Sequence, residues 1–227
     1  EISCSLVGSE MCIRDRICNF GAISDYEAMK AAGKRAHALG HPIVIDPVGV
    51  SGSSYRREKC LELMKIIHPT CIRGNYSEIQ ALLHNCGTVT GVDAAEDALA
   101  EAEETDLPEL MKQYAKENQM ILVASGETDL ITDGSCVYRC HNGSPMMARI
   151  TGSGCMSTVM LGAFLSAENS VESAVACCAF TGIAGELAAK EMTAQKRGTM
   201  TFRNWFIDAV SLMTPEQLEH GTNVDWF

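Results

Sequence analysis

Two carboxylates and one arginine stand directly after apolar runs of this chain. Asp46 ends the run PIVID, Arg73 follows the run TCI, and Glu78 lies a few residues beyond Arg73 in IRGNYSE. Two carboxylates can hold a Mg²⁺ ion, and an arginine can bind phosphates through its planar fork of N–H donors. These residue types indicate a site that handles a phosphorylated ligand.

Each carboxylate also has a structural alternative. Asp46 can start a turn in which Pro47 fixes φ. Asn75 can cap the helix that follows it, with Glu78 at the capping-box position three residues later. This alternative accounts for Glu78 but gives Arg73 no role, so both interpretations stay open from these residues alone.

Residues 148–165 read ARITGSGCMSTVMLGAFL, in which a tight Thr-Gly-Ser-Gly turn runs into an apolar stretch with helical spacing. Gly152 and Gly154 let the backbone turn tightly and aim several N–H groups at one point, where the following helix adds its positive dipole end. We therefore predict an anion hole at Gly152, Ser153 and Gly154, with the thiol of Cys155 at the start of the helix. A single GxG before a helix is a weak signal, because many helices begin in this way.

A fourth place is the stretch VASGETDLITDG, where Ser125 and Gly126 end another apolar run. The Ser125 hydroxyl and the neighbouring backbone could touch a nucleotide. Taken alone, a plain turn into a hairpin is the simpler interpretation, with the hairpin's own turn at Asp133-Gly134.

The elements that position these residues alternate between strand and helix patterns. Apolar runs predict strands at 17–21, 42–47, 70–74 and 120–125, followed by a hairpin over 129–140. Helical spacing predicts helices at 25–40, 57–67, 75–83, 107–118, 155–167, 171–192, 201–213 and 215–221. We expect an α/β fold with a mostly parallel central sheet, helices on both faces and a helical C-terminal third.

Such a sheet would bring the four places together. Ligands of open α/β sheets bind beyond the carboxyl ends of the strands, where Asp46, Arg73 and Ser125 are expected. A cation site, an arginine and a glycine turn at one location are what phosphoryl transfer requires, since its catalysis is mostly positioning and charge stabilisation.

The composition narrows the function further. The chain has 227 residues and a net charge of −11, with no block of Lys or Arg, which argues against nucleic acid as a partner. The most apolar stretch, 173–185, is shorter than the ~20 residues of a membrane span. Eleven scattered cysteines without a C-x-x-C pair favour free thiols in a reducing compartment, and we expect a cytoplasmic protein.

Five motifs together carry a family resemblance. IDPVG, IRGNxSE, SGExDxITDG, TGSGC and GTMTFRNWFIDAVSLM resemble, in order and spacing, hydroxyethylthiazole kinase of thiamine biosynthesis and salvage, from about Ile17 to Leu218. This family belongs to the ribokinase-like superfamily. The resemblance implies that Mg-ATP phosphorylates the primary alcohol of 5-(2-hydroxyethyl)-4-methylthiazole. It also implies a homotrimer with active sites between subunits.

The resemblance assigns roles to individual residues. Asp46 and Glu78 match the carboxylates of the magnesium and phosphate region, and Arg73 matches an ATP-contacting arginine. Ser125 stands where the family usually has an ATP-contacting threonine. Gly152 matches the glycine that contacts the thiazole.

Cys155 stands where the wider superfamily usually has a proton-accepting aspartate. The thiazole kinases have cysteine there, and a thiol at a helix N-terminus can supply some thiolate as a weak base. General-base help contributes roughly 10²–10⁴-fold, whereas positioning alone supplies ~7–11 kcal/mol. We therefore expect Cys155 to lie beside the attacking hydroxyl.

The beginning of the chain departs from the family. Residues 1–16, which include SLVGSEMCIRDR, resemble translated adapter sequence, so we expect a non-native leader over 1–16. Residues 17–227 would then form one kinase domain that is truncated at its N-terminus. An inactive Mg-ATP-binding fragment is therefore an alternative. Another ribokinase-like kinase, such as a hydroxymethylpyrimidine kinase, is a second alternative, but it would be expected to carry aspartate at position 155.

Overall fold

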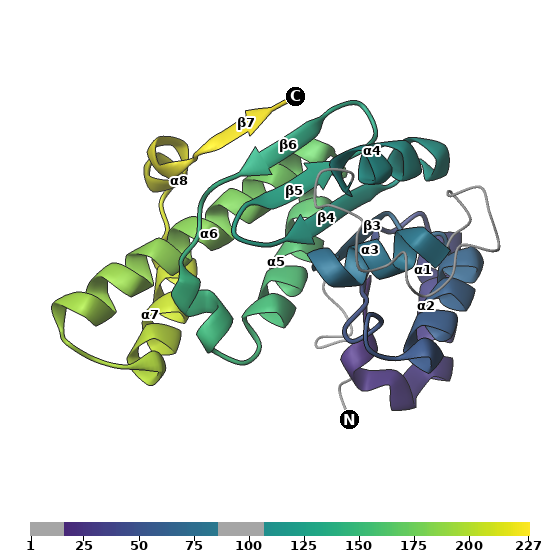
Figure 1. Ribbon diagram of the computed structural model, residues 1–227, viewed down its shortest axis with the longest axis horizontal. Coiled ribbons are helices and arrows are strands. Elements are labelled where there is room, and N and C mark those ends of the chain that lie inside the picture. The colour runs from purple at the N-terminus through teal and green to yellow at the C-terminus, as the bar shows by residue number, and fades with distance from the viewer. Residues whose placement is uncertain (1–15, 86–106) are drawn as a thin grey trace, which may run out of the picture.

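Seven strands form one sheet in which neighbours follow the order of the chain. The computed structural model describes residues 16–85 and 107–227. The strands are β1 (Arg16–Asn19), β2 (Ile43–Asp46), β3 (Cys71–Asn75), β4 (Ile121–Ser125), β5 (Asp129–Thr132), β6 (Val137–Cys140) and β7 (Val224–Trp226). β1 to β4 are parallel, and β5 to β7 continue the sheet antiparallel. Helices cover both faces, so the predicted fold class is confirmed (Figure 1).

The apolar strands are buried on both faces, and their alternating side chains enter two separate cores. In β2, Ile43 and Ile45 pack into one core while Val44 packs into the other. Ile72 and Cys71 of β3 divide in the same way. A parallel sheet covered on both sides needs such unbroken apolar runs, which is why PIVID carries no polar residue before Asp46.

One face is covered by α1 (Tyr26–Ala38), α2 (Ser54–Ile67), α3 (Tyr76–Asn85) and α4 (Leu107–Asn118). Because the strand order follows the chain and parallel crossovers are right-handed, these successive helices fall on the same side. Met29, Leu63, Leu82 and Met111 bring one buried side chain from each helix into the shared core.

The other face is covered by α5 (Ser153–Ala167) and α6 (Val171–Ala194), with α7 (Thr199–Leu212) and α8 (Pro215–Gly221) beyond them. A third apolar cluster, centred on Phe202 and Phe206, joins α6 to α7. α6 is long and apolar enough to cross a membrane, but 61% of its most apolar window is buried inside the protein, as in a core helix.

Several element boundaries differ from the prediction. α2 begins at Ser54 rather than Arg57, because the Ser53 side chain accepts a hydrogen bond from the Arg56 N–H at 3.3 Å and caps the helix. The first strand ends at Asn19 and gives way to a 3₁₀ helix over Phe20–Asp25.

Other expectations fall partly outside the described residues. The described residues do not include the polar stretch 87–104 or nearly all of the expected leader, 1–16. The leader therefore stays a prediction. The eight cysteines in the described ranges are free thiols, and six of them are buried.

Candidate active site

The ends of β1 and β2 meet the start of α5 through the side chain of Asn19. Its Nδ2 atom donates hydrogen bonds to Asp46 Oδ2 at 3.0 Å and to Cys155 Sγ at 3.3 Å. Its Oδ1 atom accepts from the Gly21 N–H at 2.7 Å. That N–H group can only donate, so it fixes which end of the amide faces Asp46.

Asp46 is a buried carboxylate with one oxygen in use. Its side chain is 2% exposed, and Oδ2 also accepts from the Thr158 hydroxyl at 2.8 Å. Burial raises the pKa of Asp46 above its ordinary value, an effect that the Thr158 hydrogen bond and the Arg73 charge reduce and the Glu78 charge reinforces. Oδ1 receives no hydrogen bond from the described parts of the chain. It is the oxygen that remains for a cation or a proton.

Arg73 reaches the glycine turn from β3. Its Nη1 atom donates to the Gly154 carbonyl at 3.1 Å. A Cβ atom at position 154 would lie 3.0 Å from that same nitrogen, so glycine allows this approach. We refer to Asn19, Asp46, Arg73, Cys155 and Thr158 as the Asp46 cluster.

The glycine turn has the geometry that an anion hole needs. Gly152 has φ +94°, in the left-handed region that favours glycine. The Ser153 hydroxyl donates back to the Met147 carbonyl at 2.9 Å, which fixes the turn. The first N–H groups of a helix lack intrahelical acceptors, so those at the start of α5 can bind an anion. Cys155 is exposed at this point.

Glu78 has both oxygens engaged by backbone N–H groups. Oε2 accepts from Asn75 at 3.0 Å, and Asn75 Oδ1 accepts from the Glu78 N–H at 2.9 Å, which is the capping box considered from the sequence. Oε1 accepts from the Gly49 N–H at 2.9 Å. Glu78 therefore joins the loop after β2 to the start of α3.

No group of three or more potential metal ligands occurs among the residues that the structure describes. In kinase sites Mg²⁺ is usually bound through one or two carboxylates and the substrate phosphates rather than through a complete protein cage. The available oxygen of Asp46, near the charge of Glu78, suits such a partial site.

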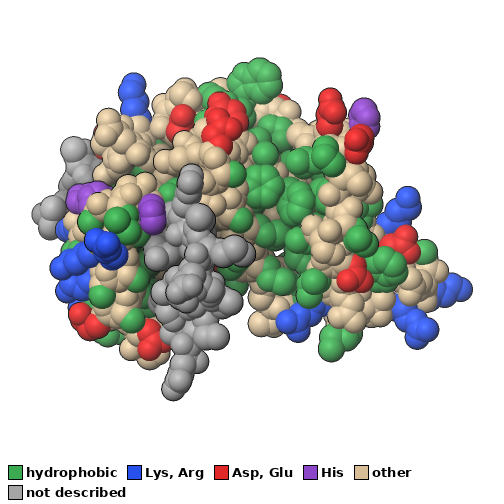
Figure 2. Space-filling model, turned by 180° about the vertical axis from the view of Figure 1, so that it is seen from behind, with side chains coloured by type: hydrophobic (Ala, Val, Ile, Leu, Met, Phe, Trp, Pro, Cys, Tyr) green, Lys and Arg blue, Asp and Glu red, His purple; other side chains and the backbone are tan. Residues whose placement is uncertain are grey.

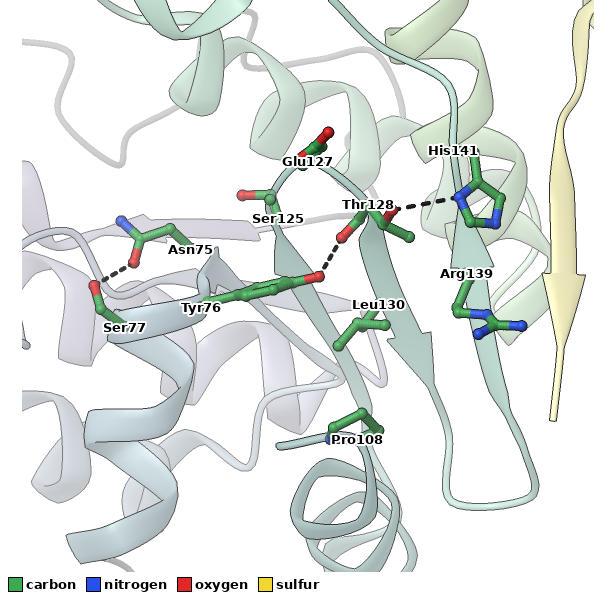
Figure 3. Close-up of a pocket in the computed structure, with 11 residues that line it drawn as sticks. Asn75, Tyr76, Ser77, Pro108, Ser125, Glu127, Thr128, Leu130, Arg139 and His141 are labelled. Carbon is green, nitrogen blue, oxygen red and sulfur yellow. Dashed lines mark hydrogen bonds between the residues drawn. The ribbon is translucent and has the colours of Figure 1, made fainter. Parts of the chain in front are cut away.

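Ser125 lies one strand further along the same edge of the sheet. Its hydroxyl donates to the Gly74 carbonyl at 3.2 Å. It borders an open cavity of about 680 Å³, which we call the Ser125 pocket (Figure 3). The pocket is lined by Asn75, Tyr76, Ser77, Pro108, Ser125, Gly126, Glu127, Thr128, Leu130, Arg139 and His141.

Side-chain contacts hold the walls of this pocket. The Tyr76 hydroxyl donates to the Thr128 carbonyl, as Figure 3 shows, and the Thr128 hydroxyl lies 3.3 Å from His141 Nδ1. Asp225 of β7 pairs with Arg139 at 2.5 Å and with His141 at 3.2 Å. The C-terminal strand thus braces the outer wall.

Three polar residues near the site were not singled out from the sequence. Asn19 ends β1 as Asp46 ends β2, a signal that could have found it. Thr158 lies one helical turn after Gly154 and had no such signal. Asp129 accepts from the Gly126 N–H at 3.0 Å, and its burial raises its pKa to about 6.

The ends of the parallel strands bring a buried carboxylate and an arginine next to the first turn of α5. This arrangement on a mostly parallel sheet is that of a ribokinase-like small-molecule kinase. The model of the hydroxyethylthiazole kinase family matches residues 14–216, and the chain belongs to that family.

Relatives agree with this assignment. The chain is 35% identical to a hydroxyethylthiazole kinase of Clostridium acetobutylicum over 91% of its own length and 77% of that protein's. It is 37% identical to hydroxyethylthiazole kinase 1 of Methanosphaera stadtmanae over 86% of its length and 72% of that protein's.

Solved structures agree in fold. The hydroxyethylthiazole kinase protein from Pyrococcus horikoshii OT3 superposes with a TM-score of 0.79 at 26% identity, over 93% of this chain and 76% of that one. The pyridoxal kinase from Staphylococcus aureus in complex with ADP has a TM-score of 0.50 at 19% identity, over 75% and 62% of the two chains, and shows the fold alone.

Proposed function

We propose that this protein transfers the γ-phosphoryl group of ATP to the primary alcohol of 5-(2-hydroxyethyl)-4-methylthiazole, in thiamine biosynthesis or salvage. Family membership and the named relatives support the substrate. The observation that carries the chemistry is the Asp46 cluster: a buried carboxylate, an arginine and a thiol lie around the start of α5.

The glycine turn would bind the phosphoryl group while it is transferred from ATP to the alcohol. Backbone N–H groups at Gly152, Ser153 and Gly154 can face the oxygens on which negative charge builds up, and Arg73 adds a fixed positive charge beside Gly154. Because these groups are already in place before the reaction, they stabilise the transferred charge without reorganising. This is the largest contribution that we assign to the protein.

Cys155 would lie beside the attacking hydroxyl. It is exposed, and its sulfur accepts a hydrogen bond from Asn19. We propose it as the group that receives the proton of the thiazole alcohol. Gly152, in the same turn, would contact the thiazole itself.

Mg²⁺ would be held by Asp46 Oδ1, with Glu78 contributing charge and the ATP phosphates supplying most of the ligands. When bound, such a cation neutralises the charge of the transferred phosphates. The Asp46 carboxylate is itself buried beside the proposed phosphate region.

ATP would extend from the glycine turn toward Ser125. The Ser125 pocket has a volume within the usual range for small-molecule sites and lies on the same edge of the sheet. Ser125 and Arg139 are the wall residues that we expect to touch the sugar and base side of the nucleotide.

A homotrimer and a cytoplasmic location complete the proposal. Large apolar side chains on α5 and α7 are exposed, among them Val159, Met200 and Leu212, which supports contact with other copies of the chain. Figure 2 shows hydrophobic side chains gathered across the middle of one face, with Lys and Arg toward its edges. Light scattering during size-exclusion chromatography tests the trimer directly.

An acceptor panel tests the function. The protein is incubated with Mg-ATP and, separately, with hydroxyethylthiazole, hydroxymethylpyrimidine and pyridoxal, and the products are identified by mass spectrometry. We expect the thiazole phosphate to form much faster than the other two phosphates. Phosphorylation of another acceptor in preference to the thiazole would refute the proposal.

A further inference from the structure

We infer that Asn19 is a positioning residue that sets the Cys155 thiol and the Asp46 carboxylate in one fixed arrangement for phosphoryl transfer. It contacts both groups through a single nitrogen, with the Asp46 oxygen at 3.0 Å and the Cys155 sulfur at 3.3 Å. The two groups come from different elements, the end of β2 and the start of α5. The catalytic part of this inference rests on the proposed function, whereas the hydrogen bonds do not.

An amide suits this place because it donates without carrying a charge. Both protons of the Asn19 amide are used, one on each acceptor, and the oxygen is held by Gly21 at 2.7 Å. The side chain is therefore fixed at both ends and cannot turn over to present its oxygen to Asp46. A charged or titrating side chain here would change the charge around both groups at once.

The bridge also decides which atoms face the substrate. Asn19 and Thr158 both donate to Oδ2 of Asp46, so Oδ1 is the oxygen left toward the cation or the proton. The Asn19 amide also donates to the Cys155 sulfur, which holds the sulfur at the start of α5. Asn19 thereby acts on the reaction through Asp46 and Cys155 without touching a reacting atom.

Asn19→Asp tests the inference with nearly unchanged shape. The new side chain lacks the two N–H donors, so it can no longer donate to Asp46 and Cys155 at once, and it places oxygen lone pairs against the Cys155 sulfur. We expect iodoacetamide to alkylate Cys155 roughly fivefold more slowly than in the unchanged protein. The rate is followed at this site by peptide mass spectrometry, because the chain has other cysteines.

Thr158→Val is the matched control. It removes the hydroxyl that lies 2.8 Å from Asp46 Oδ2 and 3.1 Å from the Gly154 carbonyl, and it leaves the contact between Asn19 and Cys155 in place. We expect the alkylation rate of Cys155 to stay within about twofold of the unchanged protein. An Asn19→Asp protein that alkylates at the unchanged rate, or a Thr158→Val protein that slows equally, would overturn the inference.

The variant with Asn19→Asp and Asp46→Asn together covers the case in which two facing carboxylates prevent folding. It restores one amide and one carboxylate to the pair, with the amide now donating from position 46. Cys155 still faces a carboxylate at position 19, so slow alkylation is expected to persist. Recovery of the unchanged rate in this double variant would contradict the role of Asn19.

Steady-state kinetics separates positioning from loss of structure. Asn19→Asp should lower kcat for thiazole phosphorylation by tenfold or more while the KM for ATP changes by less than about threefold, because Arg73 and the glycine turn are untouched. A rise in the KM for ATP as large as the fall in kcat would contradict a positioning role for Asn19. If the unchanged protein shows no kinase activity, the proposed function fails, and the alkylation result still decides whether the bridge exists.

Discussion

The Asp46 cluster and the Ser125 pocket occupy the same edge of the sheet but are built in different ways. In the Asp46 cluster, parallel strands and the start of α5 hold side chains that hydrogen-bond to one another, such as Asn19 to Asp46 at 3.0 Å. In the Ser125 pocket, antiparallel strands leave an open cavity of about 680 Å³ whose wall is braced from behind by Asp225.

The difference separates two tasks of a kinase. Groups that act on the reacting atoms need a fixed position, because even small displacements there slow the reaction strongly. A region that receives a large nucleotide needs room and a few polar contacts. The comparison predicts that changes to Asp46 and Cys155 act mainly on kcat. Changes to Arg73, which binds the phosphates in our proposal, and changes around the Ser125 pocket should act mainly on nucleotide affinity.

The largest effect is expected for Asp46→Asn. The amide keeps the size of the side chain but removes its charge, and with it the attraction for the cation that would neutralise the transferred phosphates. We expect kcat to fall roughly 10²–10³-fold. Circular dichroism should show an unchanged fold. A variant with near-normal kcat would break the assignment of Asp46 to the reaction.

Arg73→Ala should come next. Removing a charge-assisted contact to phosphate costs roughly a factor of 10 to 100, and we expect it mostly in the KM for ATP. Arg139→Ala gives the comparison within the proposed nucleotide site, because its side chain is already paired with Asp225 at 2.5 Å. Its KM should change less than that of Arg73→Ala. Unchanged ATP kinetics in Arg73→Ala would refute its phosphate role.

Cys155→Ser should have a smaller effect, confined to turnover. A serine hydroxyl is not deprotonated near neutral pH, so it cannot supply the anion that would accept the proton, but positioning still supplies most of the rate. We expect kcat to fall by about tenfold and nucleotide binding, measured by calorimetry, to stay the same. Turnover equal to that of the unchanged protein would remove Cys155 from the mechanism.

Asp129→Asn should give the smallest effect, on stability near the Ser125 pocket. Burial raises the pKa of Asp129 from 3.8 to about 6, so the folded state holds this proton more tightly than the unfolded state does. The contribution of protonated Asp129 to the free energy of unfolding is therefore present at low pH and is lost as the pH rises through about 6. The amide oxygen can still accept from Gly126.

We therefore expect Asp129→Asn to raise Tm by roughly 2–4 °C at pH 7.5. The gain should shrink toward zero as the pH approaches 3.8. Calorimetric scans of both proteins across this range measure it. A Tm difference that does not change with pH would show that the carboxylate is not held in a desolvated environment.

Much of the fold was predictable because its signals are local. Unbroken apolar runs such as Ile43–Ile45 mark strands buried on both faces, and their polar end residues mark the edge where ligands bind. β7 was missed because three residues, Val224–Trp226, carry too little pattern to predict pairing with β6. The start of α2 was missed because Ser53, rather than the charged residues after it, caps the helix.

The site was predictable only in part. The spacing of Asn75 and Glu78 offered their capping contact as one of two interpretations, since the contact lies within one helical turn. The bridge from Asn19 to Cys155 joins residues that are 136 positions apart, and no local pattern records such a contact. The same holds for the Gly49 N–H that occupies the other oxygen of Glu78.

The most direct test of the central claim follows the phosphoryl group itself. The protein is incubated with hydroxyethylthiazole, Mg²⁺ and ATP whose γ-phosphoryl oxygens carry a heavy isotope, and the thiazole is analysed by mass spectrometry. The account predicts thiazole phosphate that contains the label. Label found only in inorganic phosphate, with the thiazole unmodified, would contradict it.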